Sequence, residues 1–577
     1  MTQPPPPPPN QPPQQGGFGP PSPQQQPPQP QPGYGYPQAP QPPQPGYGYP
    51  QAASAPQPPQ PPQPGYGYPG AQQNPYAQPA QPGYGYPGQP PTVPMQPQPG
   101  QPGGGRNNTV LFIVVAAVVA IALIVAGGIW YGNSSGDNGK KHDTASSSGG
   151  TGGKNGSGGS AGGGTEKVPA DPSAKLLYQV PMPTANDIVR TVGSWLTDKA
   201  YVKTGVAEVV GYDRVKGTKL WTLKLPGPVC AASRHATADD KTAITYQPKW
   251  DTNKTIAGCS QIAAIDLDSG KMLWTKTVKS GDYPVDYQNV TVAQRTVAVG
   301  DTEGGAAFDL DSGKALWLPK PGDDCYDAGY GGGTKLVAVR NCGDSDNKRV
   351  LIQTLDPKTG KVISEYRMDS GIEYASVVST DPLVVAAEAG QDSQAQDYFS
   401  IDNKTGKLLA HISAPSNTYG GRCDSSRTED CKEVVVGDGK LYLPTDEHDG
   451  TGQYSRTNEI VSFDLSTGKP TGQRAEAGDG YTLSPLRMDG SNLLAYKRPP
   501  YDKGGQVVSI DGGSFQQTKL LENPATKNAH DAEDSMLPDS AEILFGDGRL
   551  YMSDVFADKK GSASFSKDLV VVFGTSG

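Results

Sequence analysis

Short apolar runs separated by polar turns fill residues 172–577, and the pattern repeats. In one copy, the apolar run 261–265 is followed by the turn 266–271 (Asp-Leu-Asp-Ser-Gly-Lys) and then by a second run that ends at Val278. Two strand-like runs joined by a tight polar loop with glycine near its end predict a β-hairpin. Asp266 can start the turn by bonding its own backbone, and glycine supplies the positive φ at the exit of the loop.

Near-copies of this phrase recur along the chain. They centre on Asp213, Asp266, Asp309, Asp356, Asp402, Asp464 and Asp511. The successive spacings are 53, 43, 47, 46, 62 and 47 residues, and a truncated eighth copy ends the chain at 573–577. A period of this size is typical of repeat architectures. About four short strands per period, with almost no helical periodicity, predict four-stranded antiparallel blades arranged as a β-propeller.

Two further positions of the repeat predict how blades pack. A small residue stands two positions before the Asp in most copies, and three copies carry tryptophan eight positions after it, at Trp221, Trp274 and Trp317. We expect each ring to dock over the backbone of a neighbouring blade, where removing it would cost about 3–5 kcal/mol. Ser364 and Ala410 hold the tryptophan position in later copies, so we expect that half to pack differently.

The two ends of the repeat region predict how the ring closes. The chain stops just after the last loop, and segment 174–181 resembles the strand 219–226 that would be missing there. An outer strand lent by the start of the domain would remove an open sheet edge. The sequence therefore predicts an all-β, eight-bladed propeller with strand exchange between its termini. Seven blades are the alternative, because the 62-residue spacing and the weak Asp511 copy blur the register.

The phrase Ala-x-Asp-x-x-Ser/Thr-Gly-Lys-x-x-Trp, clearest at 264–274 and 307–317, resembles the repeat of pyrroloquinoline-quinone-type propellers. That family comprises the quinoprotein dehydrogenases and non-catalytic relatives such as the outer-membrane assembly lipoprotein. The resemblance covers residues 174–577 and implies the propeller fold. For the dehydrogenases it also implies a quinone held at the propeller axis over a Ca²⁺ ion, with a catalytic Asp beside it.

Candidate chemistry is sparse. The chain has no adjacent cysteine pair, no Cys-x-x-Cys-His haem motif and only six tryptophans, so no catalytic, cofactor-binding or metal-binding residue is assigned. We expect no cofactor. Pyrroloquinoline quinone and Ca²⁺ are expected only under the alternative that the protein is a quinone-dependent dehydrogenase. The Asp-rich turns lack the twelve-residue loop and terminal Glu of a calcium site. A net charge of −9 without a Lys/Arg cluster disfavours nucleic-acid binding.

All six cysteines lie in the repeat region, and they fall into three local pairs in chain order. The expected disulfides are Cys230–Cys259, Cys325–Cys342 and Cys423–Cys431, one of the fifteen connectivities that six cysteines allow. An even number of locally paired cysteines indicates an oxidising compartment. Free buried thiols are the alternative.

The rest of the chain predicts how the protein is located in the cell. Residues 1–108 form a Pro/Gln/Gly/Tyr-rich tail that we expect to be disordered, because it has too few aliphatic side chains to offset the entropy of ordering. Within 109–131, the 21 residues 110–130 are apolar and uncharged, which predicts a transmembrane helix about 32 Å long. Residues 132–171 are a flexible Gly/Ser-rich linker, and 172–577 form the propeller.

Because the cysteines favour an exported propeller, we expect a single-pass protein of the cell membrane with a cytoplasmic N-terminus and an extracytoplasmic propeller. A Pro/Gln/Gly/Tyr tail, one anchor and an exported repeat domain are similar to the layout of actinobacterial cell-envelope proteins. The expected partners are the membrane, an unidentified protein or envelope ligand of the propeller, and a cytoplasmic partner of the tail.

The functional hypothesis is a non-catalytic binding or scaffold module. The alternatives are a quinone-dependent dehydrogenase and an extracytoplasmic sensor. Specificity should come from the least regular insertions, at 420–432, 446–458 and 497–505, because loops on a rigid scaffold usually carry binding. For any single one of these insertions, a plain solvent-exposed loop is the favoured interpretation.

Overall fold

The computed structural model describes residues 165–185, 187–250, 258–320, 322–343, 347–388, 396–424, 426–452, 455–557 and 566–575. The expected tail, the expected transmembrane helix and most of the expected linker lie outside these residues. Within the described part of the chain, no helix has the length and apolar character needed to cross a membrane.

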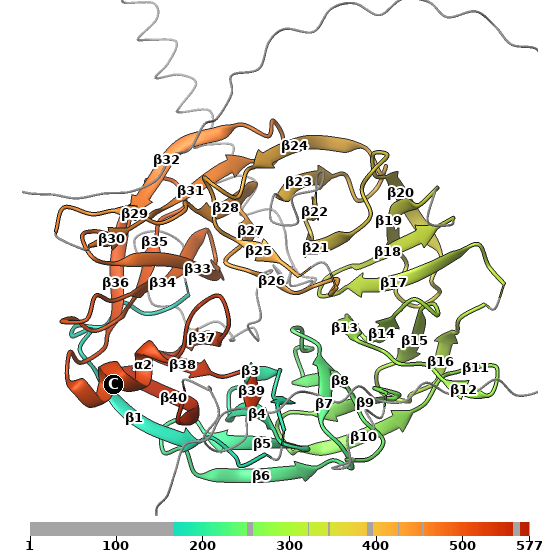
Figure 1. The fold of residues 1–577 in the computed structure, drawn as a ribbon, viewed down its shortest axis with the longest axis horizontal. Coiled ribbons are helices and arrows are strands. Elements are labelled where there is room, and N and C mark those ends of the chain that lie inside the picture. The colour runs from blue at the N-terminus through green and yellow to red at the C-terminus, as the bar shows by residue number, and fades with distance from the viewer. Residues whose placement is uncertain are drawn as a thin grey trace, which may run out of the picture. The chain divides into compact units, whose positions relative to one another are not determined.

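Eight four-stranded antiparallel sheets, here called blades, are arranged in a ring, so the eight-bladed prediction is confirmed (Figure 1). Each blade below is given from its innermost to its outermost strand. Blades 1 to 4 are β3 (Ser194–Leu196), β4 (Ala200–Gly205), β5 (Glu208–Asp213) and β6 (Lys219–Lys224); β7 (Val229–Ala232), β8 (Lys241–Tyr246), β9 (Gln261–Asp266) and β10 (Lys271–Lys276); β13 (Asn289–Ala293), β14 (Thr296–Gly300), β15 (Ala306–Asp309) and β16 (Ala315–Trp317); and β17 (Cys325–Gly331), β18 (Leu336–Cys342), β19 (Arg349–Leu355) and β20 (Val362–Arg367).

Blades 5 to 8 are β21 (Ala375–Thr380), β22 (Leu383–Glu388), β23 (Gln396–Ile401) and β24 (Leu408–Ala414); β27 (Val435–Gly437), β28 (Lys440–Pro444), β31 (Glu459–Asp464) and β32 (Pro470–Glu476); β33 (Thr482–Asp489), β34 (Asn492–Arg498), β35 (Gln506–Ile510) and β36 (Gln517–Glu522); and β37 (Glu542–Gly546), β38 (Arg549–Ser553), β40 (Asp568–Thr575) and β1 (Ala174–Pro181).

Small elements decorate the connections. Four two-stranded sheets pair β2 (Val189–Arg190) with β39 (Phe556–Ala557), β11 (Lys279–Ser280) with β12 (Tyr283–Pro284), β25 (Arg422–Cys423) with β26 (Cys431–Lys432), and β29 (His448–Asp449) with β30 (Arg456–Thr457). The one helix in the described residues, α2 (Lys527–Asp534), joins blades 7 and 8. Its Ala529 and Ala532 are buried against the core.

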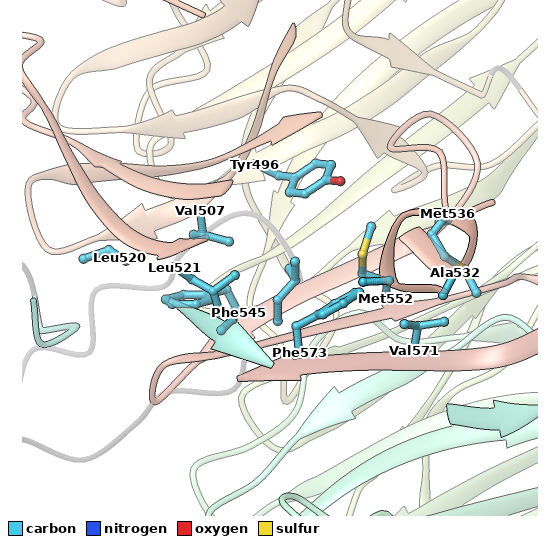
Figure 2. Close-up of a cluster of buried hydrophobic side chains, with 14 of the residues drawn as sticks. Tyr496, Val507, Leu520, Leu521, Ala532, Met536, Phe545, Met552, Val571 and Phe573 are labelled. Atoms are coloured by element: carbon cyan, nitrogen blue, oxygen red, sulfur yellow. The ribbon is translucent and has the colours of Figure 1, made fainter. Parts of the chain in front are cut away.

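Strand exchange closes the ring. β1 pairs antiparallel with β40, from Ala174 opposite Thr575 to Pro181 opposite Asp568. The first strand of the propeller is therefore the outermost strand of the last blade, as the sequence predicts. Figure 2 shows the apolar cluster beside this closure, which combines strands of blades 7 and 8 with α2 and includes the fully buried Phe573.

An aromatic ring over a glycine joins many neighbouring blades. Trp221 on β6 lies over Gly270 in the turn of blade 2, and a methyl group added at that glycine would overlap the ring. Trp274 over Gly313 and Trp317 over Gly360 repeat this contact along the ring. At the closure, Tyr178 of β1 takes the place of tryptophan and lies over Gly217 of blade 1.

Later blades pack differently, at the positions where the sequence lacks tryptophan. The Ser364 hydroxyl donates to the Asn403 carbonyl at 2.7 Å, and Gly406 lies directly against the backbone of Glu365. Gly468 likewise lies against the backbone of His411. Backbone-to-backbone contact thus replaces the ring, because a small side chain lets the neighbouring turn approach.

The two faces of the ring differ in the chain connections that they carry. In each blade, the turn between the first and second strands and the turn between the third and fourth strands lie on one side, which we call the turn face. Leu267 N, for example, donates to Asp240 O across these two turns of blade 2 at 2.8 Å. The connections between blades and the loops between second and third strands lie on the opposite side, which we call the loop face.

Ion pairs link neighbouring blades on the turn face. Lys199 of blade 1 pairs with Asp268 of blade 2, and Lys241 of blade 2 pairs with Asp311 of blade 3 at 2.9 Å. The closure has the same arrangement with the charges exchanged, since Asp547 of blade 8 pairs with Arg214 of blade 1 at 2.6 Å. Charged residues of the turn face thus join neighbouring blades at these three positions of the ring.

The closure predicts a stability effect at Tyr178. Replacing Tyr178 by Ala should lower the free energy of unfolding by about 3 kcal/mol, because the ring that covers Gly217 is lost. Leu220→Ala is the matched control, since Leu220 lies on the outer strand of the next blade and is half exposed. Urea unfolding followed by circular dichroism measures both. Equal midpoints for the two variants would contradict the assigned role of Tyr178.

The ring-over-glycine contact predicts a coupling between Trp221 and Gly270. Gly270 and Gly439 both have φ close to 70°, but nothing lies within 4 Å of a methyl group added at Gly439. Gly439→Ala should therefore cost only the left-handed backbone, about 1–2 kcal/mol. Gly270→Ala should cost about 1–3 kcal/mol more, because the methyl group overlaps the Trp221 ring. The excess should vanish in a Trp221→Ala background, and its persistence there would refute the contact.

Candidate functional site

The repeated aspartates serve the turns. Asp266 Oδ1 accepts hydrogen bonds from the backbone N of Asp268 at 3.1 Å and of Ser269 at 2.8 Å, and Gly270 N donates to Asp266 O. Hydrogen bonds from the turn's own residues lower the pKa of the aspartates of six copies, Asp213, Asp309, Asp356, Asp402, Asp464 and Asp511. These carboxylates lie in different blades around the ring, so the repeat does not build a shared site.

The three disulfides join Cys230 to Cys259, Cys325 to Cys342 and Cys423 to Cys431, the pairing that the sequence predicts. All three lie toward the loop face, at strand ends or in the connection that precedes blade 6. The turn face has short turns instead. The cross-links therefore stabilise the side of the ring where the chain is least regular.

A disulfide-closed loop extends into the ring. β25 and β26 lie inside the circle of inner strands (Figure 1), and residues 426–430 between them form what we call the axial loop. It contacts the innermost strand, or the residues directly after it, in four consecutive blades. Its hydrogen bonds reach Cys230 and Arg234 in blade 2, Asn289 in blade 3, Gly332 in blade 4 and Val377 in blade 5.

Glu429 is the charged anchor of the axial loop. One of its carboxylate oxygens accepts from Gly332 N at 2.7 Å and lies 3.0 Å from His235 Nε2, and its side chain is only 13% exposed. Burial opposes its ionisation, but His235, Thr291 and Arg234 together outweigh burial and hold the pKa of Glu429 below its usual value. The carboxylate is thus satisfied by groups of the inner strands.

Close packing holds the middle of the axial loop. Thr428 is buried, its backbone N donates to Asn289 Oδ1 at 2.9 Å, and Val377 N donates to its carbonyl at 2.6 Å. A methyl group added at Gly329 of β17 would overlap the Thr428 side chain. The middle of the axial loop is therefore packed against the inner strands as tightly as a core side chain, although the loop belongs to a connection between two blades.

The axial side of blades 1 and 8 carries a second charged pair. Lys203 is fully buried, and its Nζ donates to Glu542 Oε2 at 2.7 Å and to Thr191 O at 2.6 Å. Burial lowers the pKa of Lys203, and Glu542 opposes this shift. Lys432, at the base of the axial loop, donates to Ser540 O at 2.9 Å. The contact between Lys203 and Glu542 joins blade 1 to blade 8. The contact between Lys432 and Ser540 joins the axial loop to the segment that leads into blade 8.

The residues at the axis do not fit the quinone and Ca²⁺ that the resemblance implies for dehydrogenases. The axial loop occupies the inner-strand surface of blades 2 to 5, and the carboxylate of Glu429 in this loop is already engaged by two donors. Among the residues that the structure describes, no group of three or more His, Cys, Asp and Glu side chains is placed to hold a metal ion. No catalytic step is therefore derived through either group.

The three insertions predicted from the sequence to carry specificity differ in where they lie and how exposed they are. Residues 420–432 fold inward as the axial loop and its stem. Within 446–458, β29 and β30 form an exposed hairpin in which His448 Nε2 lies 3.1 Å from Glu459 Oε1. In 497–505, the Tyr501 side chain is 88% exposed. The last two remain available to a partner on the loop face.

Sequence reasoning missed the partners of the axial loop. Arg234 and His235 follow an unremarked inner strand, and Glu429 stands 195 and 194 residues away from them. None of the three belongs to the repeat. The one usable signal was the short spacing between Cys423 and Cys431, which marked a closed loop but not the direction in which it points.

A family model described as outer membrane protein assembly factor BamB matches residues 186–320. Among curated proteins, no sequence relative matches this chain.

Solved structures with a similar fold include a BamB protein and quinohemoprotein alcohol dehydrogenases. BamB from Moraxella catarrhalis is 13% identical, with a TM-score of 0.36 over 69% of this chain and 100% of that one. The quinohemoprotein alcohol dehydrogenase ADHIIG from Pseudomonas putida HK5 is 12% identical, with a TM-score of 0.37 over 70% and 77%. The quinohemoprotein alcohol dehydrogenase from Comamonas testosteroni is 13% identical, with a TM-score of 0.36 over 70% and 75%. Similarity at this level carries no conclusion about activity or ligand.

The matched stretch spans blades 1 to 3, which contain the clearest Asp-to-Gly turns and all three docking tryptophans. Residues 186–320 therefore carry propeller repeats of the pyrroloquinoline-quinone type.

Proposed function

We propose that this protein is a non-catalytic binding module, anchored in the cell membrane by residues 109–131, whose propeller binds a protein or cell-envelope ligand outside the cytoplasm. The loop face is the binding surface. The tail 1–108 lies in the cytoplasm and serves a separate partner. Neither a cofactor nor a metal ion takes part.

The observation that carries the proposal is the axial loop. A propeller that binds a small molecule at its axis needs that surface free, whereas here residues 426–430 are packed against the inner strands of four blades. Binding is then left to the periphery of the loop face, where Tyr283 and Tyr501 are 79% and 88% exposed. Exposed tyrosines are favoured anchors at protein interfaces, because the ring buries a large area and the hydroxyl still bonds.

The proposal predicts that partner contact is confined to one face. A photo-crosslinking amino acid replaces Tyr283, Tyr501 or, as the matched control, Val215, which is 47% exposed on the turn face. In cells producing the full chain, the first two positions should yield the same adduct and Val215 none. The isolated partner should bind the double variant Tyr283→Glu/Tyr501→Glu about tenfold or more weakly than wild type. Adducts at Val215 alone would refute the loop-face assignment.

Quinone binding and substrate oxidation distinguish the binding module from the dehydrogenase alternative. Full-length protein is mixed with pyrroloquinoline quinone and Ca²⁺, and bound-quinone absorbance and dye-linked oxidation of alcohols and sugars are followed. We expect neither saturable quinone binding nor oxidation above a protein-free control, because the axial loop occupies the inner-strand surface. Stoichiometric binding together with turnover would replace the binding-module proposal by an enzyme.

A further inference from the structure

Two residues upstream of the first strand are bound to the turn face. Thr165 and Glu166 precede β1 and belong to no blade. The backbone N of each donates to Asp489 Oδ2 at 2.9 Å, and the Thr165 hydroxyl donates to the other carboxylate oxygen. A carboxylate that accepts bonds from two successive backbone N–H groups fixes the chain direction as well as its position.

Asp489 is well suited to hold this segment. It ends β33, the innermost strand of blade 7, and is only 3% exposed. Hydrogen bonds to an ionised acceptor are roughly twice as strong as those between neutral groups, and a buried carboxylate without partners is costly. The start of the domain therefore supplies donors that this buried side chain uses.

Glu166 makes the reciprocal contacts. Its Oε1 accepts from Arg487 Nη2 at 2.6 Å, and its Oε2 accepts from the backbone N of Asp547 at 3.1 Å. Arg487 lies on β33 of blade 7, whereas Asp547 lies in the turn after β37 of blade 8. Burial raises the pKa of Glu166 although Arg487 opposes the shift, so the carboxylate is largely withdrawn from water. One side chain thus bridges two blades.

Thr165 and Glu166 bind at the inner turns, whereas the residues just before β1 bind at the outer rim of the ring. Pro172 O accepts from Glu522 N at 2.7 Å, and Ser173 bridges to Glu522, which ends β36, the outermost strand of blade 7. Without Thr165 and Glu166, the chain would therefore be fixed only at the rim of the ring. With them, it is fixed at the turns of two innermost strands.

We propose that Thr165 and Glu166 form a clasp that holds the start of the domain on the turn face between blades 7 and 8, so that residues 1–164 join the propeller there and the loop face is presented away from the point of attachment. Attachment at the rim would let either face turn toward a partner. Attachment at the inner turns keeps the turn face nearer than the loop face to the point where the linker joins. The clasp stands on its own contacts, whereas the direction relative to a membrane rests on the proposed function.

Proteolysis of the full-length protein tests the clasp. Trypsin can cut after Lys167, which follows the clasp directly, once this segment detaches. Asp489→Ala should speed that cut about tenfold or more, because a buried charged acceptor is lost. Asp479→Ala is the matched control, since Asp479 accepts from Thr451 N and the Ser455 hydroxyl on the loop face and does not contact the clasp. Glu166→Gln provides a second variant if Asp489→Ala fails to fold. Cleavage at the wild-type rate in both variants would overturn the clasp.

Energy transfer tests the direction. Full-length protein in lipid vesicles carries a donor dye at Val215→Cys on the turn face or at Tyr501→Cys on the loop face, positions separated along the axis by about 20 Å, one strand length. Transfer to acceptor lipids should be higher from position 215, and Asp489→Ala should reduce the difference. Equal transfer from both positions in the wild-type background would overturn the orientation. Failure of the chain to insert into vesicles would refute membrane anchoring in the proposed function, while the proteolysis result would still decide the clasp.

Discussion

Pairing between β1 and β40 is the constraint on which the ring depends. Seven blades are built from strands that are close in sequence, but blade 8 joins strands whose paired residues are 387 to 401 positions apart, from Pro181 opposite Asp568 to Ala174 opposite Thr575. Closing so long a loop costs conformational entropy, and the pairing must offset it. The buried cluster around Phe573 and the Tyr178 ring over Gly217 provide apolar contact beyond the backbone hydrogen bonds. Both ends of the propeller are thereby held by the same blade.

The Asp-to-Gly turn has two physical roles, which explains why it recurs so faithfully. Within a blade, Asp266 organises the hairpin and Gly270 adopts a φ of 68°. Between blades, the absence of a side chain at Gly270 lets the Trp221 ring lie on the turn. A substitution must satisfy both requirements at once. Blade 7 departs from this rule, because Phe515 stands at the glycine position with a φ of 60° and packs against Tyr442 instead.

The division between the two faces follows from that commitment. On the turn face, residues such as Lys241 and Asp311 pair across blades, so an insertion there would disturb such pairs. The loop face carries the disulfides, the axial loop and the exposed hairpin of β29 and β30. The irregular insertions of this chain lie on the loop face, and binding is expected in the same place. The clasp at Glu166 adds a direction to this asymmetry, since it occupies the turn face.

By itself, the sequence predicted the blade, the closing strand and the three disulfide pairs, and it favoured eight blades over seven. These depend on local patterns, namely the Asp-to-Gly spacing, the similarity of 174–181 to 219–226 and the order of the cysteines, and local patterns are legible in one chain. Only the tertiary structure decided that residues 426–430 turn inward to the axis and that Asp489 holds Thr165 and Glu166. The physical reason is that these contacts join residues 51 to 324 positions apart through single hydrogen bonds and charges, which have no period and cannot be recognised in the sequence until the ring brings them together.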